Sequence, residues 1–167
     1  MTVSSQLQIL FGERRPTKWV TRERPKIDRI ACPWLILRFI DAKAEFLYVP
    51  GAEVFATATR EGAVAYDIPG APLEHNGPYC SFDAFIERFG LTAPGLDRLA
   101  VIVRGADTSK LDLTPQSPGL YALSLGLSRM YADDHEMLRA GLVMYDAFYA
   151  WILDAQHETH AWPPKVA

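Results

Sequence analysis

The sequence predicts one helix-rich α+β domain with a small β-sheet of about three strands. The chain has 167 residues, 49% of them hydrophobic, which is enough for a single core. Most short segments rich in β-branched and aromatic residues lie in the first 70 residues, whereas the last third carries apolar residues at helical spacing. We expect an N-terminal arm over 1–17, a folded domain over 18–156 and a C-terminal tail over 157–167.

The three candidate strands each end at a turn or breaker signal. KWVTR (18–22) is short and β-rich, AEFLYVP (44–50) stops at Pro-Gly, and GAVAYDIPG (62–70) stops at a second Pro-Gly. Residues 1–16 carry little periodicity and are expected to form a loosely attached arm.

Helices are expected in five segments, in chain order. Pro33 predicts a helix over 33–41, because proline is tolerated at the first helical position and not deep inside a helix. The remaining segments are 81–89 with Ser81 as N-cap and Gly90 as stop, 94–107, 117–132 and 133–155. Segment 94–107 is ambiguous because its LAVIV run is β-rich, and helix is favoured. The last segment is apolar on more than one side and should be central.

The stretch IDRIACPWLILRFID (27–41) places polar residues directly before an apolar helix. Asp28, Arg29 and Cys32 would lie in a distorted turn near the helix N-terminus, where free amides and the positive end of the dipole gather. A guanidinium beside such amides can hold a tetrahedral oxyanion, and Arg104, close to Asp107, could add a second positive charge. The alternative is that Arg29 and Arg104 form structural ion pairs with Asp28 and Asp107, as Arg38 would with Asp41.

Two histidines are candidate metal ligands. His75 lies beside Glu74 in the proline- and glycine-bounded loop 69–80, and His135 lies in the acidic first turn of the last helix. Should they converge, they would form half of a site for a divalent ion such as zinc, iron or manganese. Their spacing does not require convergence, and the alternatives are a surface histidine and acids that only complement the helix dipole.

The two cysteines are expected to be reduced thiols. Cys32, at a helix N-terminus beside Arg29, should ionise more easily than a free thiol, which would make it and Cys80 candidates for redox chemistry. The alternative is that both are inert core residues. Asp146 stands among apolar neighbours, so it should have a buried partner such as an arginine or tyrosine.

Composition excludes some function classes. The net charge is -3, so no broad cationic surface supports nucleic-acid binding. No segment reaches the ~20 apolar residues of a membrane span, and the N-terminus lacks a secretory pattern. We therefore expect a cytoplasmic protein that does not act on membranes.

Four strings together resemble a known family: WVTRERPKIDRIACPWLILRFID, DIPGAPLEHNGPYCSFDAFI, VRGAD and DDHEMLRAGLVMYDAFYAW. They are similar to the C-terminal domain of ChrB-type chromate-resistance proteins, over roughly residues 18 to 153. The resemblance implies a role in the chromate response. In that family the domain follows an N-terminal region associated with transcriptional regulation, which we do not expect in this chain. The matching strings contain the candidate residues Asp28, Arg29, Cys32, His75, Cys80, Arg104, Asp107 and His135.

Three functional hypotheses follow. In the first, His75 and His135 hold a metal ion. The pocket around it acts on or senses a small anionic ligand and is completed by Asp28, Arg29, Cys32, Arg104 and Asp107. If it acts on the ligand, the protein is a metal-dependent enzyme. In the second, the arginines and helix amides form a non-catalytic module for chromate, sulfate or phosphate. In the third, Cys32 and Cys80 reduce chromate. Self-association into a homodimer is an open alternative in all three.

Overall fold

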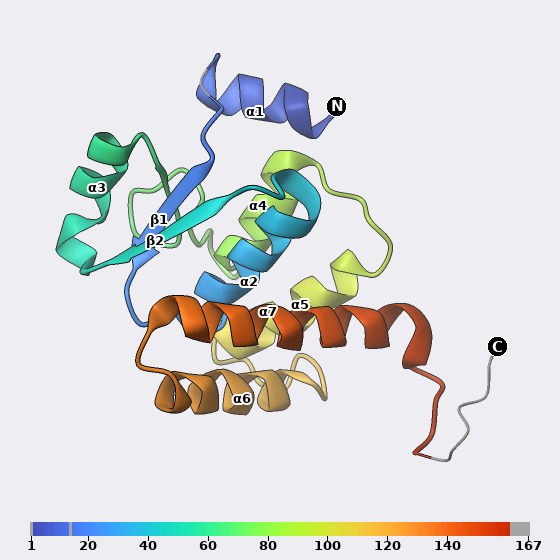
Figure 1. Ribbon diagram of the computed structural model, residues 1–167. Coiled ribbons are helices and arrows are strands. Elements are labelled where there is room, and N and C mark those ends of the chain that lie inside the picture. Colours follow the sequence, from blue (N-terminus) through green and yellow to red (C-terminus); the bar gives the residue numbers. More distant parts are fainter. Residues whose placement is uncertain (1, 14, 161–167) are drawn as a thin grey trace.

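The computed structural model describes residues 2–13 and 15–160, which form one helix-rich α+β domain around a three-stranded parallel sheet (Figure 1). The strands are β1 (Lys18–Arg22), β2 (Glu45–Val49) and β3 (Val64–Ala65). The α-helices are α1 (Val3–Phe11), α2 (Asp28–Leu35), α3 (Val54–Glu61), α4 (Ser81–Phe89), α5 (Leu96–Asp107), α6 (Ser117–Met130) and α7 (Asp134–Ala150). Short π-helical turns, η1 (Ile36–Ile40) and η3 (Trp151–Ala155), extend α2 and α7, and a 3₁₀ turn, η2 (Gly51–Glu53), precedes α3. The predicted fold class is confirmed.

The sheet has strand order β2-β1-β3, with β1 parallel to both neighbours. Parallel neighbours require crossover connections, which α2 supplies between β1 and β2 and α3 supplies between β2 and β3. In open sheets of this kind the chain turns in opposite directions after two adjacent strands, and side chains at the carboxyl ends of those strands line a crevice. Here these are the ends of β1 and β3.

The central strand separates two apolar layers. Trp19 faces the larger one, where its ring lies 5.6 Å from that of Phe85. Val20 faces the opposite side and packs with Val54 of α3 and Ala65. Because β1 is buried on both faces, it reads as a continuous buried run, as expected for a central parallel strand.

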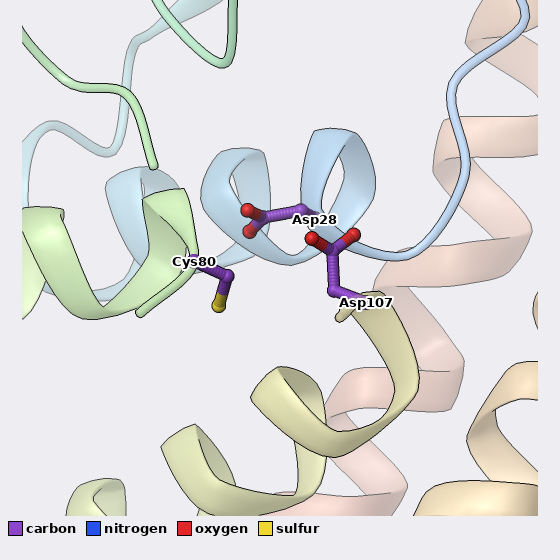
Figure 2. Close-up of side chains that lie close together, drawn as sticks. All are labelled: Asp28, Cys80 and Asp107. Carbon is purple, nitrogen blue, oxygen red and sulfur yellow. The ribbon is translucent and has the colours of Figure 1, made fainter. Parts of the chain in front are cut away.

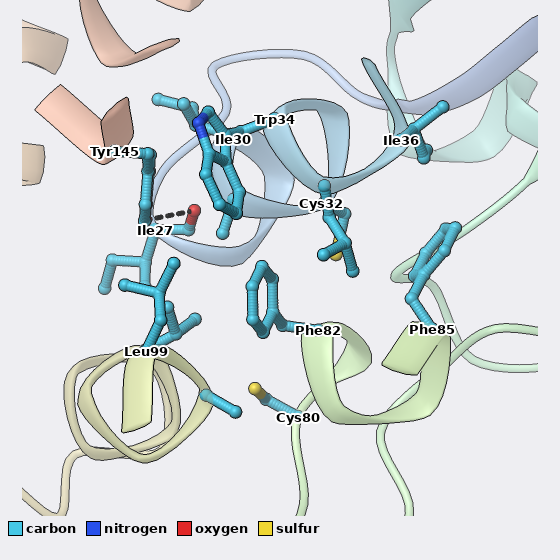
Figure 3. Packing of buried hydrophobic residues seen from close by; sticks show 14 of the residues in the cluster. Ile27, Ile30, Cys32, Trp34, Ile36, Cys80, Phe82, Phe85, Leu99 and Tyr145 are labelled. Carbon is cyan, nitrogen blue, oxygen red and sulfur yellow. Dashed lines mark hydrogen bonds between the residues drawn. The ribbon is translucent and has the colours of Figure 1, made fainter. Parts of the chain in front are cut away.

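The larger core gathers around α2. Trp34 stacks on Phe82 of α4 and packs near Tyr145 of α7, so this helix is enclosed on several sides (Figure 3). Close approach to α7 is possible because position 141 is glycine, where an added Cβ would lie 2.4 Å from Ile30 Cγ2. Asp146 accepts hydrogen bonds from Trp34 Nε1 at 2.7 Å and from Arg38, so it has an arginine partner as expected, but the pair is partly exposed and not buried, and Arg38 does not pair with Asp41.

The position of the first core helix differs from the prediction. Helix α2 begins at Asp28, so Pro33 lies inside it rather than at its first position. Proline has no N–H, and the carbonyl of Arg29 therefore loses its donor one turn later. The hydroxyl of Tyr48 on β2 donates to that carbonyl at 3.2 Å instead. A contact from a neighbouring strand thus replaces the missing helical hydrogen bond.

Two helices lie where none was predicted. Residues 3–11 of the expected arm form α1, which Thr2 caps by accepting from the Ser5 amide, and the Phe11 ring packs edge-on to Trp19. Helix α3 follows β2 almost directly. The third strand is shorter than predicted, two residues long, and Cys80 rather than Ser81 is the N-cap of α4.

Helices α6 and α7 form an antiparallel pair along one side of the molecule (Figure 1). Arg24, in the loop after β1, donates to the carbonyls of Ser128, Tyr131 and Ala132 at the end of α6 and contacts Asp134 of α7. One guanidinium therefore attaches the end of β1 to the helical pair. Among the described residues, no helix is long and apolar enough to cross a membrane.

Candidate functional site

Asp28 is the structural centre of the candidate site. Its carboxylate is almost fully buried at the first position of α2 and accepts the amides of Ser81 at 2.7 Å and Phe82 at 3.0 Å. These are free amides at the start of α4, so a carboxylate from another helix fills the role of a cap. Asp28 also accepts from the Cys32 thiol at 3.2 Å. The acid in front of the apolar helix therefore has a clear structural function.

His75 brings three carboxylates to one point. Its Nε2 atom lies 3.1 Å from Asp107 Oδ2, 3.2 Å from Asp67 Oδ1 and 3.5 Å from Asp28 Oδ2. The histidine is held by a folded loop, in which Asn76 and Tyr79 exchange backbone hydrogen bonds and Glu74 accepts the Gly70 amide. An imidazole nitrogen carries at most one proton, whereas here it faces three acceptors.

Asp67 is a member of this group that the sequence reasoning missed. It lies two residues after β3, at the edge of the sheet where β1 also ends, and its backbone has a positive φ of 49°. Its carboxylate accepts from the Ser81 hydroxyl at 3.0 Å and contacts Arg22 and Arg29 at 3.2 and 3.4 Å. The usable signal in the sequence is an acid near the carboxyl end of a predicted strand.

Asp107 completes the group from the end of α5. Figure 2 shows its carboxylate pointing toward that of Asp28, with Cys80 at the start of α4 beside them. We refer to Asp28, Asp67, His75 and Asp107 as the four-residue cluster. The backbone before Asp28 is strained, since Ile27 has a φ of 40°. The hydroxyl of Tyr145 donates a hydrogen bond to the carbonyl of Ile27 and stabilises this conformation.

Burial and mutual contact shift the protonation of the cluster. Burial raises the pKa of Asp28 to about 7. Hydrogen bonding to Asp107, and then to Asp28 and Asp67, raises the pKa of His75 to about 12. In the absence of another cation, the imidazole therefore carries the positive charge that the carboxylates require.

Two overlapping sets of residues have the geometry to hold a metal ion: Asp28 with Asp67 and His75, and Asp28 with Cys80 and Asp107. Oxygen Oδ1 of Asp28 already accepts hydrogen bonds from Phe82 and Cys32, and Oδ2 accepts one from Ser81. One lone pair of Oδ2 therefore remains available for a ligand, and His75 lies on that side. Burial raises the pKa of the Cys80 thiol well above its usual value, and the coordinating form is the thiolate. The set with His75 is the better candidate.

His135 does not lie in the cluster. It is exposed in the first turn of α7, and its ring packs against Tyr48 at 5.5 Å between centroids. Within residues 2–13 and 15–160, neither set of candidate ligands includes it. The structure thus brings His75 close to Asp28 and Asp107, which were predicted site residues, and to Asp67, which was not, whereas the convergence of His75 and His135 that the first hypothesis required is not seen.

The arginines pair with acids other than those considered from the sequence. Arg29 contacts Asp67, and its guanidinium donates to the carbonyls of Arg22 and Glu23. Arg104 makes a two-point contact with Asp83, at 2.9 Å from Nε and 2.6 Å from Nη2. Its guanidinium lies 4.8 Å from the Tyr79 ring centroid. Both charges are therefore partly neutralised.

Both cysteines are free and fully buried. Burial, followed by the nearby Asp28 carboxylate, raises the pKa of the Cys32 thiol well above its usual value. Cys32 lies inside α2 and not at a helix N-terminus, and its thiol donates to the Asp28 carboxylate, so the geometry that was expected to favour ionisation is absent. Figure 3 shows the two thiols on either side of Phe82, within the apolar packing.

Two cavities open beside His75, which is 45% exposed and lines both. The larger, of about 930 Å³, runs between α4 and α5 and includes Tyr79, Asp83 and Arg104. The smaller, of about 220 Å³, includes Arg22 and Asp67. The cluster therefore lies below a side chain that small molecules can reach.

Comparison with known proteins gives two matches. Residues 19–152 match the family model described as "ChrB, C-terminal domain". A curated relative, Protein ChrB of Cupriavidus metallidurans, is 32% identical over 133 residues, which are 79% of this chain. Those residues are 40% of that protein, so the chain corresponds to well under half of its relative. No solved structure matches significantly.

Proposed function

Because the chain belongs to the family of the ChrB C-terminal domain, we propose that it serves the chromate response by binding a divalent metal ion at the four-residue cluster and, through that ion, a small anion. The supporting observation is the approach of three carboxylate oxygens to one imidazole nitrogen, at 3.1 to 3.5 Å. A single proton satisfies one such contact well, whereas a metal ion bound by His75, Asp28 and Asp67 would engage three ligand atoms that lie within 4.8 Å of one another, with Asp107 beside His75.

His75 Nε2 lies 3.2 Å from Asp67 Oδ1 and 3.5 Å from Asp28 Oδ2, which is near the separation of two donors around one ion. Donor atoms about 2.1 Å from one ion lie roughly 3.0 Å apart in octahedral geometry and about 3.4 Å apart in tetrahedral geometry. Three carboxylates and one imidazole suit manganese, iron or zinc. Manganese and iron are favoured for anion binding, since six-coordinate ions would retain open positions beyond these protein ligands.

The charges of the site support anion binding in the metal-loaded protein. Asp28, Asp67 and Asp107 contribute three negative charges, and Arg22 and Arg29, which both contact Asp67, contribute two positive charges. A divalent ion beside neutral His75 would leave one net positive charge. A bound metal would also polarise an oxyanion or activate water, which keeps a catalytic role within the proposal.

Metal titration tests the first half of the proposal. Protein freed of metal with a chelator is titrated with manganese, iron(II) and zinc by calorimetry. We expect one site in the wild type, at least about tenfold weaker affinity in His75→Ala, and unchanged affinity in the matched control His135→Ala. The proposal fails if no metal binds, or if His75→Ala binds as the wild type does.

Anion titration tests the second half. Equilibrium dialysis with radioactive sulfate or with chromate should show binding to the metal-loaded protein and at least about tenfold weaker binding after chelation. Equal binding with and without metal would instead support a non-catalytic oxyanion module built from arginines and helix amides. Thiol-based chromate reduction is not proposed, because both thiols are buried.

A further inference from the structure

The larger cavity beside His75 is much bigger than an inorganic oxyanion requires. A five-atom oxyanion fills roughly 150 Å³ if each heavy atom takes the ~30 Å³ of one liquid water. The cavity measures about 930 Å³, within the range of sites for organic ligands. A chromate or sulfate ion would leave most of it to water.

The shape of the cavity follows from two neighbouring helices. Asp83 near the start of α4 pairs with Arg104 near the end of α5, while Arg88 and Asp97, from the opposite ends of these helices, line the same cavity. The cavity is therefore a groove along both helices. From Asp97 to Arg104 it extends roughly 10 Å, at about 1.5 Å per helical residue.

The two ends of the groove differ in chemistry. At the cluster end lie His75, Asn76, the acid Glu74 and the Asp83–Arg104 pair, so the positive charge that attracts an anion there would come from His75 or the bound metal ion together with Arg104. Ala84 and Ala100 line the groove, so small apolar side chains leave room there. At the far end, the two exposed acids Glu87 and Asp97 outnumber the one cation, Arg88, and this net negative charge disfavours a second carboxylate.

From this arrangement we infer that the groove between α4 and α5 binds an organic monocarboxylate. The carboxylate lies at the His75 end, between the metal ion and Arg104, and an unbranched or flat apolar body of roughly 5–10 carbon atoms lies along Ala84 and Ala100. This inference rests on the proposed metal site and assigns its ligand class. It requires no covalent or redox step.

Three probes of related structure test the inference on manganese-loaded wild-type protein by calorimetry. Acetate has the carboxylate alone, hexanoate adds an apolar chain, and adipate places a second carboxylate at the far end of that chain. Hexanoate should bind at least about tenfold more tightly than acetate, and adipate should bind no more tightly than acetate. Equal affinity of hexanoate and acetate, or tighter binding of adipate, overturns the inference.

A groove-filling variant gives an independent test. Ala84→Leu should remove the advantage of hexanoate over acetate while manganese affinity stays within about twofold of wild type. The control Ala122→Leu makes the same change on exposed α6 and should change neither. If circular dichroism shows that Ala84→Leu is misfolded, Ala84→Val is used in its place. The comparison of the three probes on the wild type does not depend on either variant. Absence of binding by manganese, iron(II) and zinc alike overturns both proposals, whereas metal binding without preference for hexanoate overturns only this one.

Discussion

The role of Asp28 as a cap gives a quantitative prediction for Asp28→Asn. The carboxylate accepts two α4 amides through different oxygens, Ser81 through Oδ2 and Phe82 through Oδ1. An asparagine has one carbonyl oxygen and a donor NH₂ group, so either orientation of the amide leaves one helix N–H facing a donor.

The magnitude follows from the contact that is lost. A hydrogen bond to a charged group contributes about 1.5–3 kcal/mol. Removing the negative charge from the helix N-terminus costs a further ~0.5–1 kcal/mol. The burial that raises the pKa of Asp28 no longer penalises the neutral side chain, and this relief, together with weaker repulsion from Asp67 and Asp107, offsets part of the loss in metal-free protein. We expect a net loss of about 2–3 kcal/mol, which at an m-value of ~2 kcal/mol/M lowers the urea midpoint by roughly 1–1.5 M.

The assay is urea unfolding in the presence of EDTA, followed by circular dichroism. The matched control is Asp112→Asn, which makes the same change at an exposed site and should shift the midpoint by less than about 0.2 M, since surface substitutions usually change stability by under ~0.5 kcal/mol. A midpoint for Asp28→Asn within that same limit of wild type would show that the carboxylate does not stabilise α4.

Two further predictions concern packing and burial. In thermal unfolding, Gly141→Ala should destabilise the protein by about 2 kcal/mol or more, because the added Cβ would lie 2.4 Å from Ile30. The control Gly126→Ala on α6 has open space around it and should stabilise the protein by ~0.5–1 kcal/mol. Equal effects at both sites would contradict the close contact. Cys32 and Cys80 are fully buried, so under native conditions Ellman's reagent at pH 8 should modify fewer than about 0.1 thiols per chain in the first minutes. In guanidinium chloride it should modify both thiols rapidly. Rapid modification of the native protein would reopen the redox hypothesis.

The elements that were predicted from the sequence are those whose signals are local. The strand at 18–22 and the helix ending at Gly90 carry their own residue pattern and stop signal, and both are present. Segment 94–107 was ambiguous in β-propensity and is helix α5, since its apolar positions pack on one face of a helix. The fold class and the small sheet followed from these segments.

The start of α2 could not be predicted in the same way. Pro33 is acceptable inside the helix only because Tyr48 donates to the carbonyl of Arg29, and Tyr48 belongs to a strand 19 residues away along the chain. A rule based on local sequence has no access to that contact. The same holds for Asp28, whose partners at the start of α4 are 53 and 54 residues away.

The candidate site was partly accessible from sequence. His75, Asp28 and Asp107 were chosen because of residue type and loop context, and the structure places them together. Asp67 was overlooked inside a predicted strand, although an acid at the carboxyl end of a strand is a recognisable feature of parallel sheets. His135 was chosen for residue type alone, and nothing in its spacing from His75 indicated the distance between them.

The strand order β2-β1-β3 has a consequence for the speed of folding. Although most of the chain is helical, its central strand comes first in sequence and has no partner until a crossover segment brings each neighbour alongside it. High helix content usually accompanies local contacts and folding within microseconds to milliseconds, whereas pairing between distant segments slows the search. In stopped-flow refolding, this protein should therefore behave as a mixed α/β domain and not as a helical bundle.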